Sequence, residues 1–205
     1  MNSMSTSPTP ASVPTPADRW WVLLLLAGSM AATRYHHFSD VLHLADTSWA
    51  VFFLAGLWLR ARWVFPALLG LALGIDLISV VQDGAAMNAC FTPAYPGLLL
   101  AYGALWLAGR AAQRALDTGL VQILNRLGWA TIGTLAAFAL SNLTFWAFSG
   151  HFGALGLLDY ADRVMPYLGR YIQSTLGYVL IGLAVAHLGT LRLRAPANPA
   201  PFRQG

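Results

Sequence analysis

The sequence has little charge, and none of that charge comes from lysine or glutamate. Only 10% of the 205 residues are charged; all 12 basic residues are arginine and all eight acidic residues are aspartate. Soluble domains carry about 25% charged residues, so the composition excludes an ordinary soluble domain. The chain has one cysteine and therefore cannot form an internal disulfide.

What the sequence does contain is a series of apolar runs, each a candidate membrane span. A helix needs about 20 apolar residues to cross a bilayer; the third, fifth and sixth runs satisfy this directly, and the others need polar or aromatic neighbours to complete the crossing. We therefore predict an all-α integral membrane protein with six transmembrane helices in one domain, residues 19–192, between a disordered lead-in, 1–18, and a C-terminal tail, 193–205. The runs are Trp20–Ala32, Ser48–Leu59, Trp63–Val81, Ala94–Leu107, Leu127–Phe148 and Tyr171–Leu191.

The arginines predict the orientation. If the spans alternate, nine arginines fall on the side of the N-terminus and three on the other side. Positively charged loops stay in the cytoplasm, so we expect a multi-pass protein of the bacterial inner membrane with both termini in the cytoplasm. The basic balance is thus a topology signal and indicates no nucleic-acid partner. The stretch Arg110–Arg126 is typical of an amphipathic helix at the cytoplasmic surface.

The first run has an alternative reading. Trp20–Ala27, followed by Ser29, Met30 and Ala31, resembles a signal peptide with a small-residue cleavage site. Its removal would leave five spans and spoil the alternation of charge, so we favour a retained first span.

The loops predicted on the outer side hold most of the reactive side chains. His36, His37, His43 and His151 lie there, and so does Cys90. Loops are polar because they are exposed to solvent, so each of these residues taken alone is more often a loop residue without a binding role. Their coincidence on one face makes that face the first candidate for a binding site.

Cys90 is the sharpest single feature. A free cysteine is usually a small buried hydrophobe, but this one stands among small residues before Pro93 and Pro96, which stiffen the chain. A thiolate ligates soft or borderline metals. Because no chelating set of four ligands accompanies it, it fits better as an axial ligand to a metal already held in a macrocycle.

Two features lie within the spans. Asp76 stands near the outer end of the third run, where an acid is either functional or a hydrogen-bonded packing residue. Small residues four apart, Ala27 with Ala31 and Gly70 with Gly74, are typical of close helix packing.

The chain resembles a known family from about Trp20 to Leu191, and three segments carry the resemblance. The first is Met87–Tyr95, in which Cys90 stands; the others are Asp46–Gly56 and Ser141–Leu143. With the six-span layout, they resemble the BtuM group of cobalamin transporters, which are S-components of energy-coupling-factor (ECF) transport.

The resemblance implies a six-helix S-component bundle that binds cobalamin near the outer surface. Cys90 would ligate the cobalt and promote removal of cyanide from cyanocobalamin, the one catalytic role expected. Ala27 and Ala31 would meet an ECF coupling subunit, whose ATPases supply energy; some members of the group act without that module. Cobalamin is the transported ligand, and we expect no prosthetic group.

A corrin is wide and flat, with amides at its edge, and needs aromatic walls and polar donors. Tyr95 is expected to bracket the ring, Arg163 and Asp162 to bind edge amides or the phosphate of the nucleotide tail, and the histidines to line the rim or give a second cobalt ligand. The expected substrate-binding residues are Cys90, Tyr95, Arg163, Asp162, Asp76, Asn88, Phe91, His36, His37 and His151.

Three alternatives remain open from the sequence. The first is a membrane haem or metal protein that uses the outer histidines. The second is an S-component for another vitamin, and the third is a scaffold protein without a small ligand. The chain has no GxxxxGK[ST] nucleotide-binding motif, so a partner must supply any coupled energy.

Overall fold

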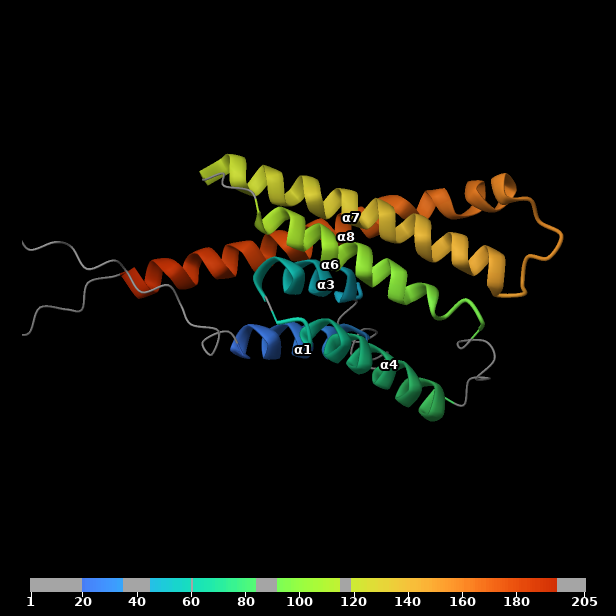
Figure 1. Ribbon diagram of the computed structural model, residues 1–205, viewed down its shortest axis with the longest axis horizontal. Helices are drawn as coiled ribbons and strands as arrows, with labels where there is room; N and C mark the ends of the chain where they lie inside the picture. The colour runs from blue at the N-terminus through green and yellow to red at the C-terminus, as the bar shows by residue number, and fades with distance from the viewer. Residues whose placement is uncertain (1–19, 35–44, 60, 84–91, 115–118, 195–205) are drawn as a thin grey trace, which may run out of the picture.

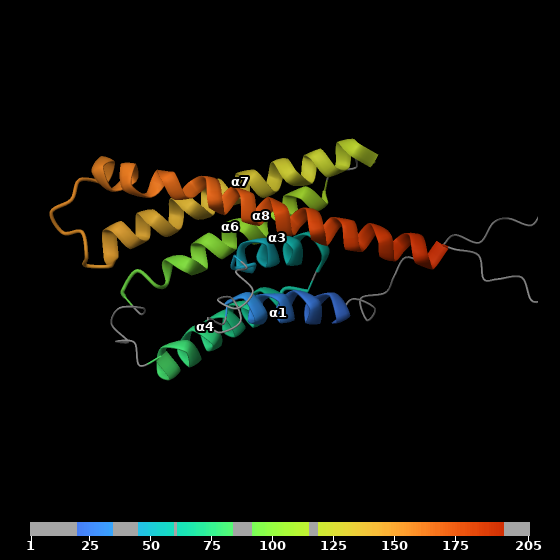
Figure 2. The ribbon, with the colours of Figure 1, turned by 180° about the vertical axis from the view of Figure 1, so that it is seen from behind.

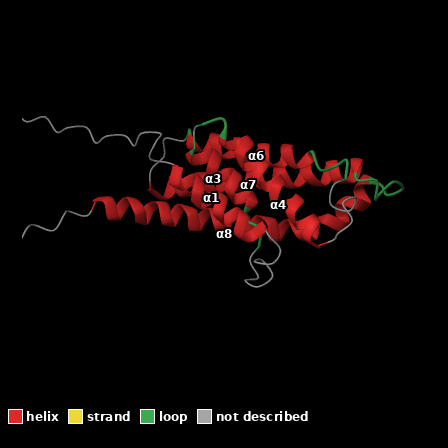
Figure 3. Cartoon of the chain, turned by 90° about the horizontal axis from the view of Figure 1, so that it is seen from below, coloured by secondary structure: helices red, strands yellow, loops and turns green. Residues whose placement is uncertain are grey.

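The computed structural model describes residues 20–34, 45–59, 61–83, 92–114 and 119–194. All regular structure in these ranges is helical (Figures 1 and 3). The prediction of an all-α chain with six helices is confirmed. The expected lead-in, 1–18, lies outside the described residues. The helices are α1 (Trp20–Arg34), α3 (Ser48–Trp58), α4 (Val64–Asp83), α6 (Gly97–Gln113), α7 (Gly119–Phe148) and α8 (Leu157–Arg194).

Three of these helices are long and apolar enough to cross a membrane unaided. They are α4 over Val64–Gln82, α7 over Gly119–Phe148 and α8 over Leu157–Leu188, whereas α1 and α3 are apolar but shorter. Large apolar side chains on α4, α7 and α8 face outward, among them Val81, Ile132 and Ile181. Helix length and hydropathy thus make the chain a multi-pass membrane protein, and its three unaided spans correspond to the third, fifth and sixth predicted runs.

Successive helices run in alternating directions (Figures 1 and 2). The blue start of α1 and the red end of α8 lie toward the same end of the molecule, which we name the termini end. The ends of α1, α4 and α7 and the starts of α3, α6 and α8 lie toward the opposite end, which we name the cavity end. The predicted alternation of spans is therefore present in the order of the helices.

Helix α3 is the centre of the bundle. It contacts each of the other five helices, and every residue from Ser48 to Leu57 is buried. A helix that is hydrophobic all round is one that is enclosed by protein or lipid. At 1.5 Å per residue its 11 residues extend only about 16 Å, so α3 is a buried core helix rather than a span.

Glycines allow α3 and α6 to touch backbone to backbone. A Cβ atom at Gly56 would collide with the Trp106 carbonyl group, and one at Gly109 with the Phe53 carbonyl group. By contrast, a Cβ atom at Gly70 would meet nothing within 4 Å. The close approach of α3 and α6 is therefore made at Gly56 and Gly109, whereas Gly70 and Gly74 meet no neighbour in the described chain.

Two predicted boundaries are wrong. The expected surface helix over Arg110–Arg126 is absent from the described residues, because 110–113 belong to α6 and 119–126 form the first turns of α7. The last connection is also shorter than expected, since α8 begins at Leu157 rather than Tyr171. In both places the helix continues beyond its apolar run, through polar residues that an apolar window cannot detect.

We predict that Gly56→Ala lowers the unfolding temperature of the detergent-purified protein, because the added methyl group forces α3 and α6 apart. Overpacking of this kind costs roughly 1–3 kcal/mol. The matched control is Gly70→Ala, which adds a methyl group in open space and gains helix propensity of up to about 1 kcal/mol. Equal effects of the two substitutions would contradict the close contact.

Candidate functional site

The last residue of α1, Arg34, forms a two-pronged ion pair with Asp76 of α4. Its Nε donates to Asp76 Oδ1 at 2.6 Å and its Nη2 to Asp76 Oδ2 at 2.7 Å. The side chains of Arg34 and Asp76 are 11% and 22% exposed. Charged groups within a membrane protein persist when they are paired, and the fork of a guanidinium matches a carboxylate in both distance and direction.

The remaining Arg34 nitrogen connects this pair to α3 and α6. Nη1 donates to Tyr102 Oη at 2.7 Å, to Ser48 Oγ at 3.0 Å and to Asp46 Oδ2 at 3.2 Å. Asp46 Oδ1 in turn accepts hydrogen bonds from the Ser48 backbone N–H and hydroxyl group. One guanidinium thus joins α1, α4, α6 and the start of α3 at the cavity end.

Tyr95 extends the network to the turn before α6. Its hydroxyl group donates to Asp76 Oδ2 at 2.7 Å. Asp76 stands on α4, before residues 84–91, and Tyr95 stands in the turn that follows them. The hydrogen bond therefore brings together the two sides of the segment that contains Cys90.

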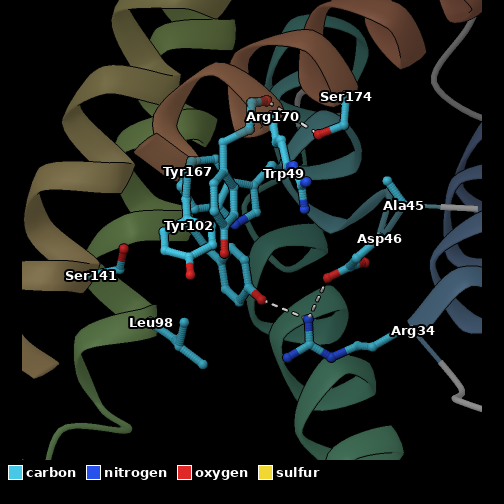
Figure 4. A pocket seen from close by; sticks show the side chains of 11 residues that line it. Arg34, Ala45, Asp46, Trp49, Leu98, Tyr102, Ser141, Tyr167, Arg170 and Ser174 are labelled. Atoms are coloured by element: carbon cyan, nitrogen blue, oxygen red, sulfur yellow. Dashed lines mark hydrogen bonds and ion pairs between the residues drawn. The ribbon is translucent and has the colours of Figure 1, made fainter. Parts of the chain in front are cut away.

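A cavity of about 510 Å³ adjoins this network. It lies between the start of α3 and helices α6, α7 and α8, and four of its 11 lining residues are aromatic (Figure 4). The rings of Trp49 and Tyr171 are 4.5 Å apart, and the ring of Phe138 packs edge-on against Tyr171. Its lining residues are Arg34, Ala45, Asp46, Trp49, Leu98, Tyr102, Ser141, Tyr167, Arg170, Tyr171 and Ser174.

The size and lining of the cavity suit a small organic ligand. Ligand sites typically measure 300–1,000 Å³ and combine apolar walls with a few placed polar groups. Here the polar groups include Arg34 and Arg170 together with Asp46, so the cavity offers both signs of charge.

Of the residues predicted from the sequence, Asp76 and Tyr95 meet in the network. Asp162 and Arg163 are exposed on the first turns of α8, and His151 is exposed in the loop between α7 and α8; none of the three lines the cavity. The predicted residues Cys90, Asn88, Phe91, His36 and His37 lie outside the described residues.

The predicted partner contacts lie on α1. Ala27 and Ala31 are both half-buried, and Ala27 packs against the hydrophobic core. More open positions on the same helix are Gly28 and Ala32. Small side chains therefore reach the outer surface of α1 beside the predicted positions.

Sequence reasoning missed most of the cavity wall. Asp46 and Trp49 entered the prediction only as part of the segment Asp46–Gly56, while Arg34, Tyr102 and Arg170 were not proposed as site residues. Tyr102 carried no local signal, because the partner of its hydroxyl group, Arg34, stands 68 positions earlier in the sequence. An arginine directly after a span, as Arg34 is, could have been paired with the acid inside another span.

Neither a protein-family model nor a curated protein sequence matches the chain. Its likeness to any family thus rests on the residues themselves.

Metal chelation by protein groups alone has no support in the described ranges. Within them, no three His, Cys, Asp or Glu side chains are placed to hold a metal ion.

We predict that Asp76→Asn destabilises the protein by about 3 kcal/mol, because removal of one partner leaves a buried charge without its counter-ion. Arg34→Gln should cost a similar amount, and the double variant less than the sum of the two. The measurement is thermal unfolding in detergent. Asp46→Asn is the matched control, since the Asp46 side chain is 42% exposed and such pairs contribute at most about 1 kcal/mol. A double variant that equals the sum would contradict direct coupling.

Proposed function

We propose that this chain takes up cobalamin across the inner membrane and binds it at the cavity end, with the Cys90 thiolate as a ligand of the cobalt. The observation that carries the proposal is the Asp76–Tyr95 hydrogen bond beside the aromatic cavity. It joins the two sides of the segment that holds Cys90, and it does so next to a site of ligand size.

The character of the cavity supports this ligand. The faces of a corrin ring are apolar and its edge carries amides, so it needs aromatic surface and scattered hydrogen-bonding groups. Trp49, Tyr102, Tyr167 and Tyr171 supply the surface, and Ser141 is among the polar groups. A cavity of about 510 Å³ holds only a part of cobalamin, and the rest of the ligand would lie outside the opening of the cavity.

The distribution of arginine supports an outward-facing cavity. Nine of the 12 arginines fall on the side of the termini, which the positive-inside rule assigns to the cytoplasm. The cavity end then faces the periplasm, from which the vitamin arrives. The architecture that we propose is an S-component-like bundle of BtuM type.

Thiolate ligation explains the proposed removal of cyanide. A thiolate is a soft ligand that suits a metal held in a macrocycle. If the thiolate binds the cobalt on the face of the corrin ring opposite the cyanide, it donates electron density to the cobalt. The cyanide ion then departs more readily, with the electron pair of its bond. Cys90 is the sole cysteine of the sequence, so this role falls to one residue.

Transport energy comes from a partner in this proposal. Small residues permit close approach of helices in a membrane, and Ala27 and Ala31 with exposed Gly28 and Ala32 give α1 such a surface. An ECF coupling subunit with its ATPases is the proposed partner.

The orientation can be tested by cysteine labelling in a Cys90→Ala background. Gly153→Cys, in the exposed loop between α7 and α8, should react with a membrane-impermeant maleimide in spheroplasts. Arg62→Cys, in the exposed turn between α3 and α4, should react only after permeabilisation, because that turn lies toward the termini end. The reverse pattern would place the cavity end in the cytoplasm.

The ligand can be tested by absorbance. Detergent-purified protein, incubated with cyanocobalamin and desalted, should retain a corrinoid spectrum with a shifted visible band, because a thiolate has replaced another axial ligand. Cys90→Ala should lose the shift.

The other outcomes favour the rival functions. A Soret band in the purified protein would indicate haem. A bound corrinoid with an unchanged spectrum in Cys90→Ala would show that Cys90 does not ligate the cobalt. Absence of any corrinoid from the wild-type protein would contradict the proposal and favour a metal, another vitamin or a scaffold role.

A further inference from the structure

Arg170 is the cation of the cavity that no described residue neutralises. It stands on α8 and lines the cavity, and within the described ranges it makes no hydrogen bond or ion pair. The other arginine of the cavity, Arg34, has each of its three nitrogens bonded to an acceptor. An arginine at a protein site typically serves to bind carboxylate or phosphate through its fork of donors.

The charged groups of the cavity come from different elements. Arg34 ends α1 and Asp46 precedes α3, whereas Arg170 and Ser174 enter from α8 (Figure 4). Asp46 is already engaged by Arg34 and by the Ser48 hydroxyl group. Within the described ranges Asp46 forms its ion pair with Arg34 and none with Arg170, so the Arg170 charge at the α8 wall is uncompensated.

Aromatic side chains line the same cavity as Arg170. Tyr167 and Tyr171 precede and follow it on α8, and Trp49 packs at 4.5 Å from Tyr171. Such rings stack on flat heterocycles. The α8 wall thus combines a donor for an anion with surface for a planar base, at the size of a nucleotide-like group rather than a whole corrinoid.

We propose that Arg170 binds the phosphodiester group of the nucleotide tail of a corrinoid, with the adjacent base against Trp49, Tyr167 and Tyr171. This inference rests on the proposed function and names the part of the ligand that the cavity takes. The phosphodiester is the one anionic group of cobalamin, since its other peripheral groups are neutral amides. Arg170 is thereby a residue that distinguishes complete cobalamin from corrinoids that lack the tail.

Arg163, which the sequence suggested for the phosphate, is placed differently. It lies seven residues before Arg170, about 10 Å nearer the start of α8. Both arginines are exposed, but only Arg170 lines the cavity. The two arginines lie on nearly the same face of one helix, so they form a matched pair for a test.

The experiment compares two ligands on four forms of the full chain. Cyanocobalamin carries the phosphodiester and the base, whereas dicyanocobinamide has the same corrin ring without them. Their dissociation constants are measured by titration calorimetry in detergent for the wild type, Arg170→Gln, Arg163→Gln and Arg114→Gln. Arg114 is an exposed residue that follows α6 at the termini end and serves as the control for loss of one charge.

We expect Arg170→Gln to weaken binding of cyanocobalamin by roughly 10- to 100-fold, the range for one charge-assisted hydrogen bond, and to change binding of cobinamide less than about twofold. Arg170→Lys should recover part of the loss, since it keeps the charge without the fork. Unchanged cobinamide binding also verifies that the variant is folded.

Equal losses for both ligands, or no loss for either, would overturn the role of Arg170 while the proposed function stands. A selective loss in Arg163→Gln alone would move the phosphate to Arg163 and overturn it as well. If the wild-type protein binds neither corrinoid, the proposed function and this inference fail together.

Discussion

The buried pair of Arg34 and Asp76 is the constraint on which the cavity end depends. A guanidinium at this depth is stable only with a counter-ion and with its N–H groups bonded, and here it takes five acceptor atoms from α3, α4, α6 and the segment before α3. Each partner sets the position of a helix along the bundle. Since Asp76 also accepts from Tyr95, the same pair holds the turn that opens α6.

This arrangement gives the cavity two unlike walls. The wall made by α1, α3 and α6 is polar but internally satisfied, because Arg34 bonds to Asp46, Ser48 and Tyr102. The wall made by α8 carries Arg170 with no such partner in the described ranges. Polar groups that are already bonded give up little to a ligand, whereas an arginine without a protein partner keeps its donors available for a ligand anion. In the proposed function, recognition therefore falls to α8, and the Arg34 network supplies the opposite side of the site.

The sequence predicted the helices well because apolar length is a property of composition within one segment. It failed at the start of α7 and α8, where helices continue through Gln122 and Asp159 beyond the apolar run. Asp76 could be recognised because an acid within a span is rare. Tyr102 and Trp49 could not, since their roles arise only when α1 and α8 come to lie beside them. The Gly70 and Gly74 spacing shows only where a helix can be approached, and the fold was needed to show that α3 and α6 approach each other at Gly56 and Gly109.

The short central helix explains why a cavity exists at all. Helices α7 and α8 extend for 30 and 38 residues, about 45 and 57 Å at 1.5 Å per residue, whereas α3 ends after 11 residues. Beyond its start at Ser48, none of the described helices fills the middle of the bundle, and the cavity lies there, with Ala45, Asp46 and Trp49 lining it from the α3 side. Because every face of α3 is buried, lengthening it would close the site without adding contact to lipid. The full burial of α3 and its shortness thus act together. The helix packs the interior of the bundle, and because it ends early it leaves room for the cavity that the proposed function assigns to a ligand.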